Sequence, residues 1–485
     1  MAAADRSATP LFLSLDQGSH AGRAQVFNTQ GICVAQASAP CETLRPGNDR
    51  VEHDAAALVA GLRRCLEDVA QQLGSAVEQI VAAALVTQRS SVVCWDKLSG
   101  VALTPVLSWQ DRRGQAWLKP FEAQAEFIHA RTGLMLSAHY GASKLRWCLD
   151  HVTGVQTAAR AARLAYGPLA SFLLFHLLDE RPLLVDTGNA ARTLLWNLQQ
   201  RDWDPALANL FGVALQYLPV CVANRYPFGT LRIQSHAVPL LLCHGDQPAA
   251  LFANGQPSTH CAYINVGTGA FVQRPLEHQP TPIPGLLTTL LFDSGATQQF
   301  VVEGTVNGAA SALAVVAREL DLEMSDVMEK LPRWLAESTA PPLFLNGVSG
   351  LGSPFWCADF ASRFVGTGSV AEQMVAVVES IVFLLQSNLL AIEGQVSAAE
   401  AIVISGGVAQ LDGLCQALAT LSGRPVRRPA DTEASARGAA WLLAQSSVWT
   451  TTAFDEFVPG PPGALHARYR HWRAALDSQL LAITC

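Results

Sequence analysis

Two short glycine turns carry the side chains in this sequence that could bind phosphate. In the first, Asp16 ends an apolar run and is followed by Gly18 and Ser19, with Arg23 a few residues later. The second is the Gly-Thr-Gly sequence at residues 267–269. Backbone N–H groups and hydroxyls on such turns can cradle phosphates, while an arginine and a magnesium ion supply positive charge. Either turn alone is an ordinary hairpin, but the two facing each other across a cleft would form a nucleotide site.

The better-known nucleotide motifs are excluded. The chain has only four lysines and none follows a glycine, so there is no P-loop. The glycine-rich loop and strand lysine of protein kinases are also missing. No HExxH motif or paired metal-ligand spacing occurs among the twelve histidines. A phosphate-binding site built from glycine turns, without a lysine, is therefore favoured. The four lysines are Lys97, Lys119, Lys144 and Lys330.

The composition predicts a globular chain with at least two cores. A length of 485 residues exceeds what one hydrophobic core serves, half of the residues are apolar, and 15% are charged. The formal net charge of −7 argues against nucleic acid as a partner, because binding a phosphate backbone needs a basic face.

Cysteine usage and hydropathy predict a cytoplasmic protein without a membrane partner. The eleven cysteines contain no CxxC pair, which favours free thiols in a reducing compartment. Residues 1–10 lack the apolar stretch of a signal peptide, and the apolar stretch at 164–178 is too short to cross a bilayer.

Apolar runs and turns predict an antiparallel meander followed by a helix and a buried strand. Strands are expected at 11–15 and 23–27, then a short third strand that runs through Val34, and later a strand at 80–86. Asp54 is a suitable helix N-cap and Gly74 a stop signal, with leucines on one face between them.

The opening pattern recurs later in the chain. A strand at 261–266, a glycine turn and a return strand at 270–273 are followed by a strand at 401–404 that runs into Ser-Gly-Gly. We interpret this as an internal duplication, with a domain boundary near 248–258 and a ligand held between the halves. The tail after residue 446 becomes helical at 464–481 and is expected to pack on the second domain.

About ten short motifs resemble those of the FGGY carbohydrate kinases and follow one another in the same order as in that family. The pattern resembles that of glycerol kinases in particular. The resemblance covers roughly residues 11–445. In the first half the motifs are Leu13–Ser19, Val51–Asp54, Thr87–Arg89, Trp95–Asp96, Ser108–Arg113, Thr132–Leu134, Ser143–Trp147 and Asp186–Thr193. In the second half they are Gly245–Gln247, Gly267–Gly269, Ser349–Pro354 and Ser405–Gly407.

The resemblance implies an α/β fold of two ribonuclease H-like (actin-like ATPase) domains around a central cleft. It implies a homo-oligomer, dimer or tetramer, that uses ATP and Mg²⁺. The expected divisions are a disordered N-terminus at 1–10, an acceptor-binding domain at 11–250, a nucleotide-binding domain at 251–446 and an extension at 447–485.

The resemblance also implies a role for each matching residue. Asp246 would be the general base that takes the proton of the acceptor hydroxyl, and it would share the magnesium ion of ATP with Asp16. Gly308 and Gly407 would line the nucleoside pocket, since glycine lets a base lie against the backbone. The phosphates would be contacted by Ser19, Arg23, Gly267 and Thr268. The acceptor would be bound by Arg89, Trp109, His139, Asp246 and Gln247. Taken alone, Trp109 would be a core residue and Asp246 a helix N-cap.

Two departures concern the acceptor. Glycerol kinases place a carboxylate immediately after the arginine of the Gln-Arg pair, and here Ser90 stands there. Their tyrosine after the Thr-Gly-Leu motif is replaced by His139, with Tyr140 next to it. Serine cannot reproduce the acceptor strength of a carboxylate. A longer polyol, a ketose or a sugar acid therefore fits as well as glycerol, and Arg89 without its carboxylate neighbour could favour an acidic acceptor.

Other departures concern ATP. His20 and Ala21 replace hydroxyl residues of the first turn, and Ser405 and Leu411 replace an aspartate and an asparagine of the family. Each loss weakens nucleotide binding by on the order of 1 kcal/mol. We expect an active kinase for a small polyol, sugar or sugar acid. The alternatives are a catalytically weak relative that acts as a sugar or nucleotide sensor or scaffold, and an actin-like or chaperone-like ATPase, which would have no need of the Trp109 motif.

Overall fold

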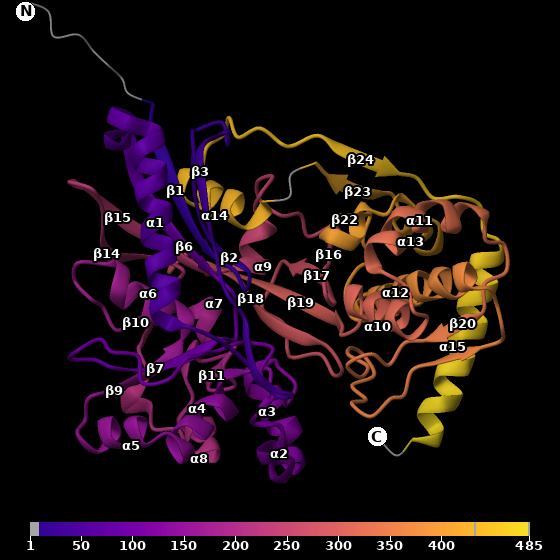
Figure 1. The fold of residues 1–485 in the computed structure, drawn as a ribbon, viewed down its shortest axis with the longest axis horizontal. Helices are drawn as coiled ribbons and strands as arrows, with labels where there is room; N and C mark the ends of the chain where they lie inside the picture. Colours follow the sequence, from indigo (N-terminus) through magenta and orange to yellow (C-terminus); the bar gives the residue numbers. More distant parts are fainter. Residues whose placement is uncertain (1–8, 431–432, 484–485) are drawn as a thin grey trace, which may run out of the picture. The chain divides into compact units, whose positions relative to one another are not determined.

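The computed structural model describes residues 9–430 and 433–483 and divides into two compact units (Figure 1). Unit 1 comprises Met1–Pro257, Thr289–Phe300 and Glu433–Thr451; unit 2 comprises Ser258–Thr288, Val301–Thr432 and Thr452–Cys485. The first change of unit falls within the expected boundary region, and two later segments return to unit 1. Most of the predicted N-terminal segment 1–10 lies outside the described residues.

Unit 1 is built on a mixed six-stranded sheet of order β14-β15-β6-β1-β2-β3. β1 pairs antiparallel with β2 and parallel with β6, and β2 pairs antiparallel with β3, which confirms the predicted meander. The strands are β1 (Leu11–Gln17), β2 (Ala21–Phe27), β3 (Cys33–Pro40), β6 (Ile80–Thr87), β14 (Arg225–Ile233) and β15 (His236–Gly245).

Helices cover both faces of this sheet because the side chains of β1 alternate between them. Leu13 and Leu15 share a core with α1 (Ala55–Leu73), whereas Phe12 packs with Ala436 and Ala440 of α14 (Ala434–Ala444). The predicted helix boundaries are confirmed. Asp54 caps α1 by accepting from the amide of Ala57 at 2.9 Å, and Gly74 ends the helix at φ 56°.

A second sheet of unit 1, of order β4-β5-β8-β7-β9, carries the loops that follow β6 and β8. Its strands are β4 (Leu44–Gly47), β5 (Arg50–His53), β7 (Val92–Asp96), β8 (Val106–Leu107) and β9 (Leu164–Pro168). Further helices of unit 1 are α2 (Gln115–Leu118), α3 (Ala125–Thr132), α4 (Gly141–His151), α5 (Thr153–Arg160), α6 (Leu169–Leu177), α7 (Thr187–Ala190), α8 (Pro205–Phe211) and α9 (Asp246–Ala250). Two strand pairs complete the unit, β10 (Leu184–Asp186) with β13 (Val220–Val222) and β11 (Trp196–Asn197) with β12 (Asp202–Trp203).

Unit 2 repeats the opening pattern of unit 1. β16 pairs antiparallel with β17 and parallel with β22, as β1 does with β2 and β6, which confirms the predicted duplication. The sheet that contains these strands has the order β18-β19-β17-β16-β22-β23-β24, and Thr289–Phe300, in β18 and β19, is the segment of it that belongs to unit 1. Its strands are β16 (Cys261–Val266), β17 (Ala270–Leu276), β18 (Leu287–Asp293), β19 (Gln298–Val306), β22 (Ala401–Ser405), β23 (Val426–Pro429) and β24 (Phe454–Phe457).

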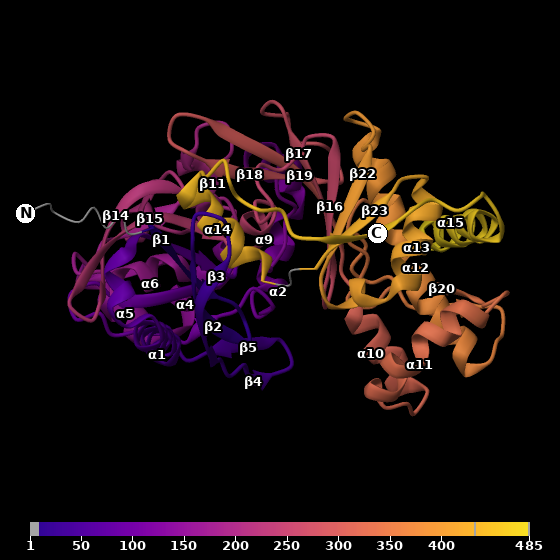
Figure 2. The ribbon, with the colours of Figure 1, turned by 90° about the horizontal axis from the view of Figure 1, so that it is seen from above.

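Helices α12 (Val370–Glu393) and α13 (Asp412–Ser422) lie beside β22 and β23 (Figure 2). By length and composition α12 could span a membrane, but 89% of its most apolar stretch is buried inside the protein, as expected of a central core helix. The predicted C-terminal helix is α15 (Ala464–Ala482), whose buried Trp472 joins the core of unit 2. The remaining elements of this unit are α10 (Ala310–Glu319), α11 (Met324–Glu337) and the pair β20 (Leu343–Leu345) and β21 (Arg363–Val365).

One expectation about the cysteines is wrong. Nine cysteines of the described residues are free thiols, as predicted, and five of these are buried. Cys357, however, is disulfide-bonded, so the cysteines are not uniformly free. Sequence spacing could not reveal this bond, because pairing depends on which residues the fold brings together.

Candidate active site

The turn between β1 and β2 positions a carboxylate beside a guanidinium. Asp16 and Arg23 are opposed in the antiparallel register, and the amide of Gly18 closes the turn on the carbonyl of Ala21 at 3.0 Å. Opposed residues present their side chains on the same face of the hairpin. Arg23 Nε also lies 3.4 Å from the carboxylate of Glu433, which immediately precedes α14.

Asp16 is a buried carboxyl group. It is 6% exposed, and its Oδ1 has no hydrogen-bond partner among the described residues. Burial raises its pKa to about 7, with the charge of Asp246 acting in the same direction and Arg23 opposing it. Two neighbouring carboxylates in a buried setting are stabilised by a shared cation.

A second group of residues gathers where β15 passes into α9. The stem of Arg89 packs against Gly245, because a Cβ at that glycine would lie 2.4 Å from Arg89 Cδ. Arg89 Nη2 donates to the side-chain Oε1 of Gln247 at 2.6 Å, and the backbone N–H of Gln247 donates to Asp246 Oδ1 at 2.8 Å. Burial raises the pKa of Asp246, while Arg89 works in the opposite direction by favouring the carboxylate.

Trp109 lies between the β1–β2 turn and His139. Its indole Nε1 donates to Ser19 Oγ at 3.1 Å, and the Ser19 hydroxyl donates to Gln88 Oε1 at 2.9 Å. The centroid of the Trp109 ring lies 5.6 Å from that of His139. We call Arg89, Trp109, His139, Asp246 and Gln247 the acceptor cluster.

His139 is surrounded by positive charge. Its pKa is lowered well below the ordinary value, first by burial and then by four cationic side chains. The imidazole is therefore neutral at physiological pH and can both donate and accept a hydrogen bond. The four cations are Arg112, Arg192, Lys144 and Arg89.

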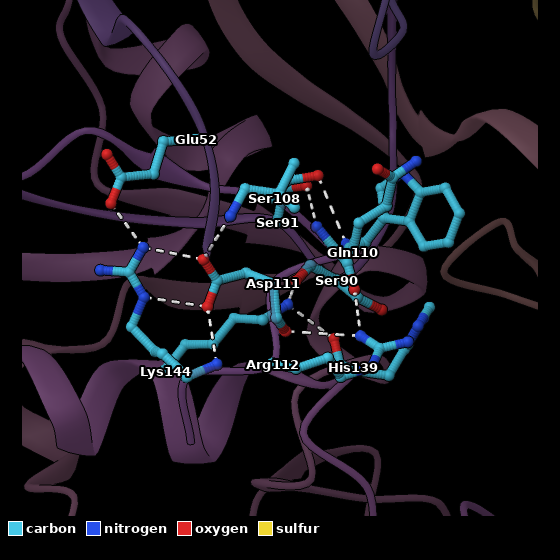
Figure 3. Close-up of polar contacts among 12 residues, drawn as sticks. Glu52, Ser90, Ser91, Ser108, Gln110, Asp111, Arg112, His139 and Lys144 are labelled. Carbon is cyan, nitrogen blue, oxygen red and sulfur yellow. Dashed lines mark hydrogen bonds and ion pairs between the residues drawn. The ribbon is translucent and has the colours of Figure 1, made fainter. Parts of the chain in front are cut away.

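Lys144, on α4, joins the two loops that carry Arg89 and His139. Its Nζ donates to the carbonyl of Ser90 at 3.0 Å and to that of His139 at 2.7 Å (Figure 3). The lysine is fully buried, and Ser90 has the left-handed backbone with φ 64°. Burial lowers the pKa of Lys144 well below its ordinary value. The sequence analysis placed Lys144 in a motif but gave it no role. The feature that could have pointed to it is its type: it is one of only four lysines in the chain, and it stands among the buried residues of α4.

The loop that holds Trp109 is anchored by an ion-pair network. Asp111 is fully buried and accepts from Arg113 at 2.7 Å and from the amide of Val51 at 2.8 Å (Figure 3). Arg113 also pairs with Glu52. Because β5 supplies Val51 and Glu52, this network ties the loop to the second sheet of unit 1.

The turn of unit 2 is also closed by a backbone hydrogen bond from a glycine amide, although it is one residue tighter than that of unit 1. The amide of Gly267 donates to the carbonyl of Gly269 at 2.8 Å. The carbonyl of Thr268 accepts from the amides of Ala309 at 3.0 Å and Ser311 at 3.1 Å, which ties the turn to the start of α10. Thr268 itself is exposed.

The two glycines expected at the nucleoside pocket have different surroundings. A Cβ at Gly308 would lie 2.8 Å from the carbonyl of Val348, so the packing of unit 2 itself requires a glycine there. A Cβ at Gly407 would meet nothing within 4 Å. Leu411, which stands where the family has an asparagine, is buried in the core of unit 2 and provides no hydrogen-bonding side chain.

Two family models together match nearly the whole chain. The N-terminal domain of the FGGY family of carbohydrate kinases matches residues 11–253, and the C-terminal domain matches residues 262–447. The chain belongs to this family. The enzyme is therefore a phosphotransferase that uses an alcohol group as acceptor.

Relatives of this FGGY kinase include bacterial glycerol kinases. The chain is 31% identical over 452 residues to glycerol kinase of Polaromonas naphthalenivorans, covering 90% of each chain. It is 32% identical over 444 residues to glycerol kinase of Alkalilimnicola ehrlichii, again covering 90% of each.

Solved structures support the fold of this FGGY kinase. Glycerol kinase of Plasmodium falciparum, solved with ADP, gives a TM-score of 0.86 at 20% identity and covers 97% of this chain and 98% of that one. Gluconate kinase of Lactobacillus acidophilus gives 0.85 at 18% identity and covers 98% of both. The predicted fold of two ribonuclease H-like domains is confirmed.

The predicted site residues of this FGGY kinase fall into two sets. Unit 1 brings together the acceptor cluster with Asp16 and Ser19 through the contacts above. Gly267, Thr268, Gly308 and Gly407 belong to unit 2. Sequence reasoning missed Gln88, Lys144 and the network around Asp111, because their roles come from contacts between segments distant in the chain.

Proposed function

We propose that this FGGY kinase transfers the γ-phosphate of ATP to a hydroxyl of a small polyol, sugar or sugar acid, with Asp246 as the general base. One observation supports the proposal most strongly. Asp246, which accepts from the backbone amide of Gln247 and is stabilised in its ionised form by Arg89, is near enough to the buried Asp16 for its charge to raise the pKa of Asp16. This combination provides a base for the acceptor and a cation ligand for the nucleotide.

Asp246 would accept the proton of the attacking hydroxyl. A carboxylate suits this role because the hydroxyl becomes acidic only as its oxygen bonds to phosphorus. Burial favours the protonated acid, and Arg89 counteracts this by favouring the ionised form that a base needs. Arg89 and Gln247 would orient the acceptor, with Trp109 as an apolar wall for its carbon skeleton and His139 as a neutral hydrogen-bonding partner.

Asp16 and Asp246 fit a magnesium ion that arrives with ATP. Asp16 has a buried carboxylate oxygen without a hydrogen-bond partner among the described residues, and the two charges raise the free energy of the ionised pair. Within the described parts of the chain there is no group of three or more histidine, cysteine or acidic residues that could hold a metal. Mg²⁺ is usually bound by one or two carboxylates plus phosphates and water, and Asp16 and Asp246 would supply the carboxylates. When bound, Mg²⁺ would neutralise charge on the phosphates.

The remaining nucleotide contacts are proposed for the two glycine turns. Ser19 and Arg23 of unit 1, and Gly267 and Thr268 of unit 2, would contact the phosphates through hydroxyl, guanidinium and amide groups. Gly407 would lie against the nucleoside, since the space where its side chain would stand is open. Gly308 would shape that pocket through its close contact with Val348.

The test is ADP release with Mg-ATP against a panel of polyols, ketoses, aldoses and sugar acids. We expect one acceptor to raise turnover well above the acceptor-free rate, and Asp246→Asn to lower kcat by at least about 100-fold, a typical contribution of a general base. Asn at this position keeps the shape of the side chain, so the melting temperature should not fall. Unchanged turnover in Asp246→Asn would refute the assignment of the base.

We also propose that the protein acts in the cytoplasm and that it forms a homo-oligomer, either a dimer or a tetramer. Its partners would be small molecules rather than nucleic acid or membranes. The net charge of −7 and the glycerol kinase relatives support this. Light scattering on the purified protein would measure the mass, and a monomer would contradict the proposal.

A further inference from the structure

A closed ring of hydrogen bonds joins the loops after β6 and β8 to the β1–β2 turn. Trp109 donates twice, from its indole Nε1–H to Ser19 Oγ at 3.1 Å and from its backbone N–H to Ser91 Oγ at 3.0 Å. Ser19 and Ser91 then both donate to Gln88 Oε1, at 2.9 Å and 3.1 Å. Gln88 and Ser91 are 2% and 1% exposed, so the bond between them is shielded from water. We call these four residues the hydrogen-bond ring.

Every proton in this ring has a fixed direction. The N–H groups of Trp109 can only donate, and an amide oxygen can only accept. Gln88 Nε2 faces the carbonyl of Gly18 at 3.4 Å, which puts Oε1 on the side of the two serines. Each serine therefore accepts from Trp109 and donates to Gln88. Because the single hydroxyl proton of Ser19 is committed inside the protein, the backbone N–H of Ser19 would be the group that meets a phosphate at this turn.

The ring stands between two sets of residues with different proposed roles. Trp109 belongs to the acceptor cluster, and Ser19 belongs to the turn proposed to contact phosphates. Gln88 also holds that turn through the backbone, since its N–H donates to the carbonyl of Gln17 at 2.9 Å. A turn that is held in one conformation before the ligand arrives loses less conformational entropy on binding.

We infer that Gln88 is a positioning residue, which holds the β1–β2 turn ready for the phosphates of ATP and makes nucleotide binding depend on Trp109. The inference rests on the proposed kinase function and adds to it a coupling between the acceptor side and the nucleotide side of unit 1. Gln88 would act through Ser19 and Trp109 rather than by contacting either substrate.

The experiment measures binding of the non-hydrolysable β,γ-imido analogue of ATP with Mg²⁺, by calorimetry and without an acceptor. We expect Gln88→Met to raise Kd about threefold to tenfold, the effect of losing about one hydrogen bond. Trp109→Phe should do the same, although it changes the acceptor side and no acceptor is present. The double variant should bind no more weakly than the weaker single one, because either change opens the ring. Ser91→Ala opens the ring with a smaller change and decides the matter if Gln88→Met does not fold.

Two matched controls separate binding from stability. Gln25→Met removes a buried glutamine of β2 whose Nε2 donates to Gln36 Oε1 at 3.3 Å, outside the ring. Trp203→Phe removes an indole donor to the carbonyl of Pro219 at 2.8 Å, also in unit 1. We expect Kd of both to stay within about twofold of wild type, whatever their melting temperatures.

The outcomes separate this inference from the proposed function. If the hydroxyl of Ser19 itself donated to a phosphate, Gln88→Met would free its proton, and Kd would stay the same or fall. That result, or additive effects of Gln88→Met and Trp109→Phe, would overturn the inference and leave the kinase function standing. If no acceptor in the activity panel is phosphorylated, the kinase function fails, and the titrations decide the inference alone. A wild-type enzyme that does not bind the analogue would overturn both.

Discussion

At the scale of single residues, the site depends on ionisable groups held away from water. Asp16, Lys144 and His139 each have a pKa displaced towards the neutral form, and burial is the first cause in all three. Displaced pKa values of this kind cluster at functional sites, because binding a charged ligand requires uncompensated charges nearby.

Asp16 makes the stability of the ligand-free enzyme depend on pH. Its pKa of about 7 in the folded state exceeds the unfolded value of 3.8, so the folded state binds more protons between these values. The stability contributed by the protonated acid is fully present below about pH 4 and is lost as pH rises through 7. Asp16→Asn should therefore stabilise the protein at pH 8 by up to roughly 4 kcal/mol relative to wild type, and hardly at pH 4.

Chemical denaturation of both proteins at pH 4 to 8 measures this difference. Added Mg-ATP should reduce it by stabilising wild type more than the variant. A difference that does not change with pH would show that Asp16 does not titrate in this range.

Lys144 should act as a positioning residue for the acceptor. Lys144→Met removes the donor to the carbonyls of Ser90 and His139, and each carbonyl left unsatisfied costs about 1–3 kcal/mol. We expect KM for the acceptor to rise about tenfold because both loops shift, with KM for ATP little changed. Lys119→Met, at an exposed lysine of the same unit, is the control. An unchanged acceptor KM in a folded Lys144→Met protein would contradict this role.

At the scale of elements, a buried polar network supports β15, the strand that leads into Asp246. Nδ2 of Asn224 lies within 3.1 Å of Asp186 Oδ2, the carbonyl of Cys243 and His244 Nδ1. His244 Nε2 in turn contacts the carbonyl of Leu291 in β18 at 2.8 Å. Burial lowers the pKa of His244 to about 3, so the ring is neutral: Nε2–H donates to Leu291 and Nδ1 accepts from Asn224.

Removing the central amide of this network should destabilise unit 1. Asn224→Ala removes a buried donor from the carbonyl of Cys243 and from His244 Nδ1 on β15, while Asp186 on β10 keeps its bonds from Asn189. We expect a loss of about 2–4 kcal/mol in the free energy of unfolding. Asn209→Ala, at an exposed asparagine of α8, should change it by less than about 0.5 kcal/mol. Urea denaturation compares the two, and equal midpoints would show that the network carries little stability.

Elements formed by local signals could be predicted, and those that depend on distant segments could not. The hairpin of β1 and β2 and the limits of α1 follow from apolar runs, the turn after Asp16 and the signals at Asp54 and Gly74. The return of α14 to the sheet of unit 1 depends on Ala436 and Ala440 packing against Phe12, which no local pattern indicates. The same reason hides the hydrogen bond from Lys144 to the carbonyl of Ser90, since the two residues are 54 positions apart in the sequence.

At the scale of the whole molecule, the residues proposed to bind the acceptor and the nucleotide belong to two units with similar strand patterns. Unit 1 carries the acceptor cluster, and unit 2 carries the second glycine turn and Gly407. Acceptor and nucleotide binding should therefore respond separately to substitutions in the two units. Adjacent glycines at the end of β22 provide a direct test of this division.

Gly407→Val should weaken nucleotide binding without harming the fold. The residue is exposed, a Cβ there meets nothing within 4 Å, and its φ lies outside the left-handed region, so the protein accepts a side chain. A bulky side chain would occupy the space proposed for the nucleoside, and we expect KM for ATP to rise at least about tenfold with acceptor binding unchanged. Gly406→Ala is the contrast: at φ 99°, its Cβ would lie 2.5 Å from the carbonyl oxygen of Val266, so it should lower the melting temperature. A Gly407→Val enzyme with normal KM for ATP and a normal melting temperature would place the nucleoside elsewhere on unit 2.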